Sequence, residues 1–380
     1  MSKIFVLAPD AFKESMSAEQ ACQAMQRGIQ KVIPDACIIQ VPMADGGEGT
    51  VDALISSLRG QQIPCEVTGP LPEQRIHTYW GLMDAGQTAV IEMAKANGIH
   101  LLPPSQRNPM LTSTYGTGEM IKQALDLGVK KIIIGLGGSI TNDGGAGMAQ
   151  ALGVRFLNYV GEPIRVCGGN LYLVKSMDLS GLDPRLADTE IIIASDVNNP
   201  LRGPHGASII FGPQKGAMPE MVKQLDQNLG HFADVVAGQI GRDHRHVAGA
   251  GAAGGLGFGL MAFTAASIRS GVELMIEQVK LSEKIAQADY VLTGEGKIDS
   301  QTSLGKTPFG VAQLARQFNK PVIAFAGLVG EGIEDLFESG FSQIIGINPP
   351  DCPLEEALKN AEVNLQLAVS KVCADLDLVQ

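Results

Sequence analysis

The sequence predicts an α/β protein in which a doubly wound parallel sheet, formed by both ends of the chain, is interrupted by an inserted mixed α/β domain. Near both ends, short apolar strands alternate with helical stretches of about 10 to 15 residues, a pattern typical of parallel βαβ units. The middle is less regular and combines patterns of paired strands with long loops. At 380 residues the chain is long enough for two domains. We expect residues 1–70 and 285–380 to form one discontinuous domain and residues 71–284 to form the insertion.

The N-terminal elements follow this alternation. They are a strand at 3–8, a helix at 17–32, a strand at 37–42 and a helix at 49–58. Ser17 and Gln20 form a capping-box pattern, in which each side chain bonds the backbone N–H of the other residue. The first helix is therefore expected to begin at Ser17.

The C-terminal elements have the same character. Strands are expected at 290–292, 321–326 and 341–347, and helices at 309–318, 333–339 and 354–376. In the middle of the chain, strands are expected at 66–67, 76–80, 88–91 and 190–194. The sequence leaves open which domain contains residues 111–148.

Composition restricts the class of partner. The net charge is −11, no basic run occurs and aromatic residues make up 5% of the chain, so neither nucleic acid nor a membrane surface is expected as a partner. An anionic substrate stays open, because a cleft can be locally positive in an acidic protein. The uncharged stretch 247–267 is long enough to span a bilayer, but its glycines and alanines favour a turn that leads into a buried helix.

The N-terminus and the cysteines indicate a cytoplasmic protein. The apolar run that precedes Pro9 is too short for the core of a signal peptide. The six cysteines are scattered and include no C-x-x-C pair, so we expect them to be reduced and mostly buried.

The most informative motifs are glycine-rich turns with acidic residues, each placed after an apolar strand-like run. They lie at 45–50, 135–145 and 293–299. Glycines expose backbone N–H groups to an anion, and a helix N-terminus adds partial positive charge. Carboxylates beside such glycines suit a Mg²⁺ ion carried by a phosphate-bearing ligand. The pattern therefore predicts an enzyme that acts on nucleotide phosphates.

Other motifs are weaker. Residues 249–254 match G-x-G-x-x-G, but no strand pattern precedes them, which disfavours a dinucleotide site. Residues 305–307 resemble the end of a P-loop, but Ser300 stands where that motif requires glycine. Zinc-ligand spacing and a G-x-S-x-G elbow are both missing from the sequence. Residues 8–17 place Lys13 before a helix N-terminus, which fits an anion cradle and a simple capping loop equally well.

Nine segments carry a resemblance to a known family. In chain order they are 8–18, 44–50, 116–119, 137–148, 195–201, 211–217, 249–255, 293–299 and 305–306. Through them, nearly the whole chain resembles the bacterial glycerate kinase family, which phosphorylates D-glycerate with ATP. Ala11 and Ile140 depart from the family pattern, where serine and a smaller residue are usual.

The resemblance implies a flavodoxin-like domain formed by both chain ends, an inserted α/β domain and an active site in the cleft between them. It implies a Mg²⁺-dependent transfer of the γ-phosphoryl group of ATP to D-glycerate. The segments 12–15 and 249–255 look most similar to the branch that makes 2-phosphoglycerate, with 3-phosphoglycerate as the alternative product. An NAD(P)-dependent hydroxy-acid dehydrogenase and a non-catalytic nucleotide sensor are the rival classes.

Each candidate site residue has a provisional role under this resemblance. Asp196 is the first choice and Asp299 the second for accepting the hydroxyl proton, while Lys13 binds phosphate or the glycerate carboxylate. The candidate Mg²⁺-organising carboxylates are Asp45, Asp143 and Glu295. The other candidate substrate-binding and phosphate-binding residues are Asp10, Ser15, Ser17, Gly137, Gly138, Ser139, Asn142, Gly251, Gly254, Gly294, Gly296 and Lys306. The alternative for each carboxylate is a helix cap.

Overall fold

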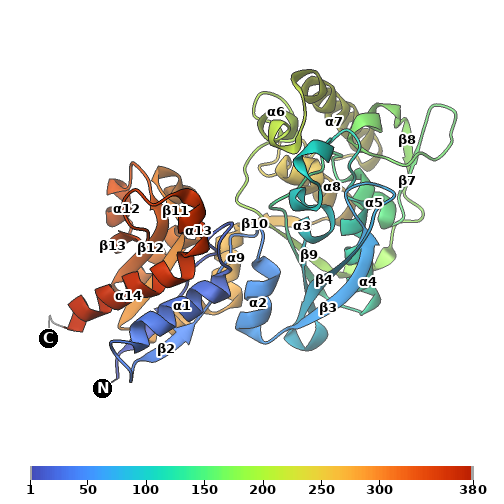
Figure 1. Cartoon of the computed structure of the whole chain (residues 1–380). Coiled ribbons are helices and arrows are strands. Elements are labelled where there is room, and N and C mark those ends of the chain that lie inside the picture. The colour runs from blue at the N-terminus through green and yellow to red at the C-terminus, as the bar shows by residue number, and fades with distance from the viewer. Residues whose placement is uncertain (1, 378–380) are drawn as a thin grey trace. The chain divides into compact units, whose positions relative to one another are not determined.

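The computed structural model describes residues 2–377 and divides into two compact units (Figure 1). Unit 1 contains the residues up to Asp45, the segment Asp52–Arg59 and the residues from Val272 onward. Unit 2 contains Gly46–Val51 and Gly60–Gly271. Both chain ends therefore belong to one unit, and the middle of the chain forms the other.

Unit 1 is built on a five-stranded parallel sheet with the order β13-β12-β11-β1-β2. Its strands are β1 (Ile4–Leu7), β2 (Cys37–Gln40), β11 (Tyr290–Ile298), β12 (Val322–Val329) and β13 (Phe341–Gly346). This confirms the prediction that strands from the two chain ends share one parallel sheet. Leu7 pairs with both Gln40 and Leu292, so β1 lies between β2 and β11.

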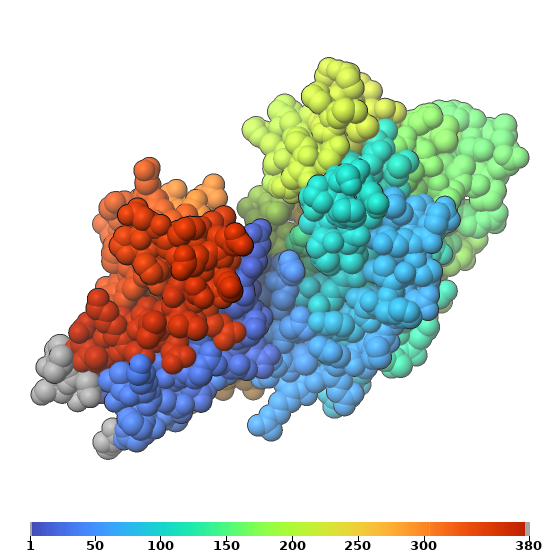
Figure 2. All heavy atoms as spheres, in the orientation of Figure 1, coloured from blue at the N-terminus to red at the C-terminus, as the bar shows by residue number. Residues whose placement is uncertain are grey.

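Each helix of unit 1 buries apolar side chains. They are α1 (Ala18–Gln30), α2 (Thr50–Leu58, shared with unit 2), α9 (Gly271–Gln278), α10 (Leu281–Gln287), α11 (Thr307–Gln317), α12 (Glu334–Glu338), α13 (Leu354–Lys359) and α14 (Ala361–Asp377). The predicted capping box at Ser17 and Gln20 is present. Met25 of α1 and Leu365 of α14 lie in the same core cluster, and Figure 2 shows the two chain ends, blue and red, side by side on this unit.

Three predicted boundaries in unit 1 were wrong. The acid-and-glycine segment after residue 292 is not a turn, because β11 continues through it to Ile298. β12 likewise continues past Gly327 to Val329, and the single terminal helix is divided into α13 and α14. A glycine such as Gly294 fits inside β11 because the Phe325 carbonyl oxygen would lie 2.4 Å from any Cβ there.

Unit 2 contains a six-stranded mixed sheet with the order β10-β9-β6-β5-β4-β3. Its strands are β3 (Gln61–Thr68), β4 (Arg75–Met83), β5 (Thr88–Glu92), β6 (Lys131–Gly135), β9 (Glu190–Ala194) and β10 (Ser267–Arg269). Neighbouring strands among β5, β6, β9 and β10 pair in parallel. At the edge of the sheet, β4 pairs antiparallel with β5, and β3 pairs antiparallel with β4. β7 (Arg155–Leu157) and β8 (Ser176–Asp178) form a separate antiparallel pair.

The helices of unit 2 cover this sheet and enclose a large core that includes the buried Trp80, the single tryptophan of the chain. They are α3 (Ala94–Asn97), α4 (Tyr115–Asp126), α5 (Ala146–Ala151), α6 (Ala207–Phe211), α7 (Pro219–Ile240) and α8 (Ala252–Thr264). Residues 111–148, which the sequence could not place, belong to this unit. α8 is buried after a glycine-rich turn, as predicted.

Two expectations about the whole chain can be compared with the structure. Across residues 2–377, no helix is both long and apolar enough to cross a membrane. All six cysteines are free thiols, but only Cys22 and Cys373 are buried, so the prediction of mostly buried cysteines was wrong.

Candidate functional site

In unit 1, acidic side chains gather where β1 and β11 lie together. The two segments are held beyond the end of β1, since the Ala8 N–H donates to the Leu292 carbonyl (2.8 Å) and the Asp10 N–H donates to the Gly294 carbonyl (2.8 Å). The Thr293 hydroxyl also donates to the Ala8 carbonyl at 2.8 Å. This ladder places Asp10 beside the part of β11 that carries Glu295, at the edge of the sheet where α/β enzymes bind ligands.

The surroundings of the Asp10 carboxyl group disfavour its negatively charged form. Its carboxylate accepts hydrogen bonds from the Ala11 N–H (2.6 Å) and the Thr307 hydroxyl (2.5 Å). Burial, followed by repulsion from Asp45 and Glu295, raises the pKa of Asp10 to about 7 despite these bonds. Three carboxyl groups therefore influence one another here.

Glu295 is stabilised by two neighbours. Its carboxylate accepts a hydrogen bond from the Thr302 hydroxyl at 3.0 Å and lies 3.4 Å from the Lys306 amine. Burial raises the pKa of Glu295, while Lys306 and Thr302 oppose the shift and Asp45 adds to it. The predicted residues Asp10, Asp45, Glu295 and Lys306 are thus brought together in one unit.

Asp299 has a different environment. It caps the 3-10 turn Ser300–Leu304, where its carboxylate accepts from the Gln301 N–H at 3.0 Å. Its other oxygen lies 2.7 Å from the Lys297 amine. The bond with Lys297 lowers the pKa of Asp299. This is the capping arrangement that the sequence analysis held open as the alternative to catalysis.

The turn between β1 and α1 presents Lys13 to solvent. The Ser15 hydroxyl donates to the Phe12 carbonyl at 2.9 Å, and the Ser17 hydroxyl accepts from the Gln20 N–H at 3.1 Å. Both predicted hydroxyls therefore already serve the turn and the helix cap. A Cβ on Gly296 would lie 3.3 Å from the Lys13 backbone nitrogen, so the turn packs closely on β11.

The carboxylates of unit 1 can be tested for their fit to Mg²⁺. Among residues 2–377, no three acidic, histidine or cysteine side chains are arranged to hold one metal ion together. Mg²⁺ commonly takes only one or two protein carboxylates and completes its shell with water and substrate phosphates. The mutual repulsion of Asp10, Asp45 and Glu295 is a property that a bound cation would relieve. These residues therefore fit such an ion.

In unit 2, the predicted glycine turns pack against one another. A Cβ on Gly137 would lie 2.5 Å from the Gly47 Cα, and one on Gly254 would lie 2.0 Å from the Thr141 carbonyl oxygen. The Gly144 N–H donates to the Gly254 carbonyl at 3.0 Å. Gly137 and Gly254, which were predicted to bind phosphate, thus allow close packing of the backbone. Because no strand precedes the 249–254 turn, it lacks the context of a dinucleotide fingerprint.

Asp143 is completely buried within this cluster of turns. Its carboxylate accepts from the N–H (2.8 Å) and hydroxyl (2.9 Å) of Thr114 and from the N–H groups of Gly145 (3.2 Å) and Gly147 (3.1 Å). Burial raises the pKa of Asp143, and these bonds oppose that shift. The side chain links the start of α4 to the start of α5.

Lys215 is a functional candidate that was not predicted from the sequence. Its amine is buried and donates to the Ser139 hydroxyl oxygen (2.8 Å) and the Thr141 carbonyl (2.7 Å). Burial lowers the pKa of Lys215 to about 7, and Asp143 partly opposes this. The only signal in the sequence was its place between glycines in the segment 211–217, which does not reveal that a lysine is buried.

Asp196 lies two residues beyond β9, where strand 190–194 was predicted. Its carboxylate accepts from the Gly271 N–H at 3.2 Å and is half-buried. Gly249 lies nearby, since a Cβ on it would be 3.2 Å from the Val197 carbonyl oxygen. Unit 2 therefore brings Asp196 into the neighbourhood of one predicted glycine turn.

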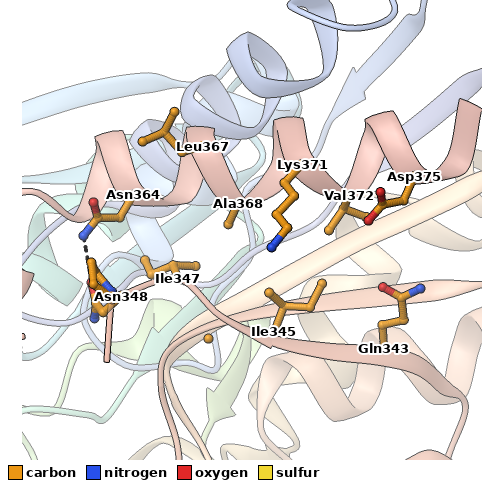
Figure 3. Close-up of a pocket in the computed structure, with 12 residues that line it drawn as sticks. Gln343, Ile345, Ile347, Asn348, Asn364, Leu367, Ala368, Lys371, Val372 and Asp375 are labelled. Carbon is orange, nitrogen blue, oxygen red and sulfur yellow. Dashed lines mark hydrogen bonds between the residues drawn. The ribbon is translucent and has the colours of Figure 1, made fainter. Parts of the chain in front are cut away.

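Two open cavities lie away from these groups. One, of about 460 Å³, lies between β13 and α14, where Asn364 donates to Asn348 at 2.9 Å and Lys371 points inward (Figure 3). The other, of about 590 Å³, is lined partly by Arg75 and Arg165, which already bond to Glu119 and to the Pro72 carbonyl. Neither cavity contains a site residue predicted from the sequence.

Carboxylates, amines and glycine turns near the ends of parallel strands define an α/β enzyme. Its similarity to a known protein family makes it a phosphotransferase. The model of the glycerate kinase family matches residues 5–377. The chain belongs to the glycerate kinase family.

Individual relatives agree with this assignment. The chain is 50% identical to the "Glycerate kinase" of Haemophilus influenzae, with 95% of each protein covered. It is 46% identical to the "Glycerate 2-kinase" of Escherichia coli strain K12, with 98% of this chain and 97% of that protein covered. A crystal structure from Salmonella typhimurium LT2, of a protein provisionally named glycerate kinase 2, is similar with a TM-score of 0.89, 45% identity and full coverage of both chains.

Proposed function

We propose that this enzyme transfers the γ-phosphoryl group of ATP to the C2 hydroxyl of D-glycerate and so makes 2-phosphoglycerate. The observation that carries the proposal is the similarity, along nearly the whole chain, to a protein named glycerate 2-kinase. Phosphoryl transfer depends mainly on positioning the reactants and neutralising charge. The charged groups described above are suited to both tasks.

Unit 1 supplies the groups that would handle charge. Asp45 and Glu295 would hold Mg²⁺, which when bound neutralises charge on the phosphates of ATP, and Asp10 lies beside them. Lys306 and the exposed Lys13 are cations suited to phosphate or carboxylate oxygens. Asp143 is a weaker candidate for the metal, because four hydrogen bonds already use its oxygens.

Unit 2 supplies the proposed general base. Asp196 would accept the proton of the glycerate hydroxyl as that oxygen bonds to the γ-phosphorus and ADP leaves. The half-buried carboxylate at the end of a parallel strand supports this role. Asp299 is the second choice, because its capping bonds and its bond with Lys297 occupy its oxygens. The turn at 137–142 would bind an anionic group of a substrate.

The fold and the domain division can also be stated more finely. We assign unit 1 to the flavodoxin-like class, which is supported by its strand order, since β2-β1-β11-β12-β13 corresponds to 2-1-3-4-5. The proposal of a discontinuous domain with an insertion at 71–284 is supported by the two compact units, of which unit 2 contains Gly46–Val51 and Gly60–Gly271. A cytoplasmic location and the lack of nucleic-acid and membrane partners stay predictions from the sequence.

A coupled assay of ADP release tests the proposed reaction. Turnover should require both D-glycerate and a divalent cation, and it should stop after exhaustive chelation. Equal turnover with and without glycerate would overturn the kinase proposal. Phosphorus NMR then identifies the product, because the phosphorus couples to one proton in the 2-phosphate and to two in the 3-phosphate.

Asp196→Asn tests the proposed base. The amide cannot accept the hydroxyl proton, so kcat should fall by about 100-fold or more while ATP binding is kept. If kcat stays normal, the base is not Asp196, and Asp299→Asn becomes the next variant to measure.

A further inference from the structure

Lys215 is unusual because it is a buried lysine that forms no ion pair within the described residues, although the buried Asp143 interacts with it electrostatically. It is 1% exposed, and it is the only lysine or arginine that is buried among residues 2–377. Within the same residues, no carboxylate forms an ion pair with its amine, whose acceptors are the Ser139 hydroxyl oxygen and the Thr141 carbonyl. Burying a charge with only neutral acceptors is unfavourable, so packing alone does not account for a lysine at this position.

The backbone fixes where the Lys215 side chain begins. Lys215 ends the 3-10 turn Pro213–Lys215, and its N–H donates to the Gly212 carbonyl at 3.0 Å. The next residue, Gly216, has a φ of +91°, and a Cβ there would lie 2.3 Å from the Arg107 carbonyl oxygen. The close packing of the backbone at Lys215 and Gly216 therefore fixes the point from which the amine reaches the turn after β6.

The contact with Lys215 determines which further hydrogen bonds the Ser139 hydroxyl can form. A hydroxyl oxygen that accepts from the lysine keeps its own hydrogen for another acceptor. Within residues 2–377, the hydrogen bond in which the Ser139 hydroxyl takes part is the one that it accepts from Lys215. The adjacent Asn142 is similar, since its carbonyl oxygen accepts from the Ser208 hydroxyl at 3.1 Å while its buried side-chain amide nitrogen has no partner in the described part of the chain.

We propose that Lys215 is a positioning residue, which holds the turn at Ser139 and Thr141 so that the Ser139 hydroxyl and the Asn142 amide donate to an oxyanion of a substrate. The inference rests on the proposed kinase function and deepens it. The bound group is a phosphoryl or a carboxylate oxyanion, because both are acceptors only. Either substrate can supply it: ATP through a phosphate, or D-glycerate through its carboxylate.

The experiment measures steady-state kinetics for Lys215→Met, Ser139→Ala and the double variant, with ATP and D-glycerate varied in turn. Each single variant should lower kcat/KM by about 100-fold, the scale for losing an oriented donor at a reacting group. The double variant should lose little more than either single variant, because the lysine acts through the serine. A raised KM for ATP identifies a phosphate, and a raised KM for glycerate identifies the carboxylate.

Lys223→Met is the matched control, because Lys223 is exposed on α7 and pairs with the exposed Glu220. It should keep normal kinetics. The fluorescence of Trp80 reports whether unit 2 remains folded in each variant. If Lys215→Met does not fold, Ser139→Ala still decides the matter, because it removes only one hydroxyl from the same turn.

The result that overturns the inference is a Ser139→Ala variant with unchanged kinetics, or fully additive losses in the double variant. This outcome differs from failure of the proposed function, in which the wild-type protein shows no glycerate-dependent turnover. In that case, calorimetric binding of ATP and of D-glycerate is compared between the wild type and Ser139→Ala. Equal affinities for both compounds would overturn the inference, and a weaker affinity for one would support it.

Discussion

Acidic residues and glycines lie within β11 in unit 1 and after β6 in unit 2. Burial raises the pKa of carboxyl groups in both places, but the groups that surround them differ. Near β11, Asp10, Asp45 and Glu295 repel one another, and the pKa of Asp10 rises to about 7. After β6, Asp143 is surrounded by donors that satisfy its oxygens. A bound cation would relieve the repulsion in the first group, whereas the hydrogen bonds of Asp143 join the start of α4 to the start of α5.

The glycines differ in the same way. Gly254 in unit 2 is required because another backbone segment lies where a Cβ would be. In unit 1, Gly296 leaves room for the turn that presents Lys13. The same sequence pattern therefore lies in two different environments, and substitutions should show whether each one matters for ligand binding or for packing.

Gly254→Ala should have the largest effect. A Cβ would lie 2.0 Å from the Thr141 carbonyl oxygen at a φ of +68°, so we expect unit 2 to lose about 4 kcal/mol of stability. Denaturant unfolding followed by Trp80 fluorescence measures this loss. The control is Gly238→Ala in α7, where nothing lies within 4 Å and stability should rise by about 0.5 kcal/mol. Equal stability of the two variants would show that the turn can relax.

Lys13→Ala should leave stability unchanged and weaken catalysis. Removing a charged contact at the reacting centre should raise the activation free energy by about 2 to 4 kcal/mol, measured through kcat/KM. Lys31→Ala, at another exposed lysine of unit 1, should have no effect. A normal kcat/KM in Lys13→Ala would make Lys13 a solvated surface residue.

Asp143→Asn should act mainly on the fold. The amide group would turn a donor toward backbone N–H groups that now donate to the carboxylate, at a cost of about 2 kcal/mol. Thermal unfolding of unit 2 should shift down, and the exposed Asp126→Asn is the control. If Asp143→Asn keeps its stability but needs more Mg²⁺ for activity, Asp143 has the metal role predicted from the sequence.

Asp10→Asn should be visible as a change in the pH dependence of stability. The pKa of Asp10 is raised from 3.8 to about 7 on folding. Between these values the unfolded chain has released a proton that the folded protein keeps, so stability should fall as pH rises through this window. In metal-free buffer, hydrogen exchange in β1 should show this fall in the wild type and not in Asp10→Asn.

The exposed Asp375→Asn should keep the wild-type pH profile in the same measurement. Added Mg²⁺ should reduce the fall in the wild type if the neighbouring carboxylates bind the ion. A wild-type β1 whose exchange does not depend on pH would show that Asp10 ionises freely, and the contrast between the two edges would then disappear.

Much of the fold was predictable because apolar runs report buried strands directly. The strand at 190–194 and the start of α1 were placed correctly, since one is a continuous apolar run and the other carries its own cap. The extension of β11 to Ile298 was missed, because a segment with Gly294 and Gly296 has the composition of a turn. Its strand conformation depends on β12, which is distant in the sequence.

The candidate site was predictable only as a set of residue types. Residue type and spacing correctly placed Asp143 after an apolar strand, but Glu295 lies inside β11, and the two segments have the same kind of composition. What differs is the number of donors that the fold brings to each carboxylate. Lys215 was overlooked for the same reason, since its burial follows from the packing of a 3-10 turn on a distant loop.

The sequence by itself determined the alternation of strands and helices, the family and the glycines that allow backbones to approach closely. These properties depend on local periodicity and on residue identity, which can be read without coordinates. Only the tertiary structure decided which carboxylates remain in mutual repulsion and which are saturated by hydrogen bonds. Desolvation and charge interactions depend on neighbours that converge from distant parts of the chain, as Asp10, Asp45 and Glu295 do.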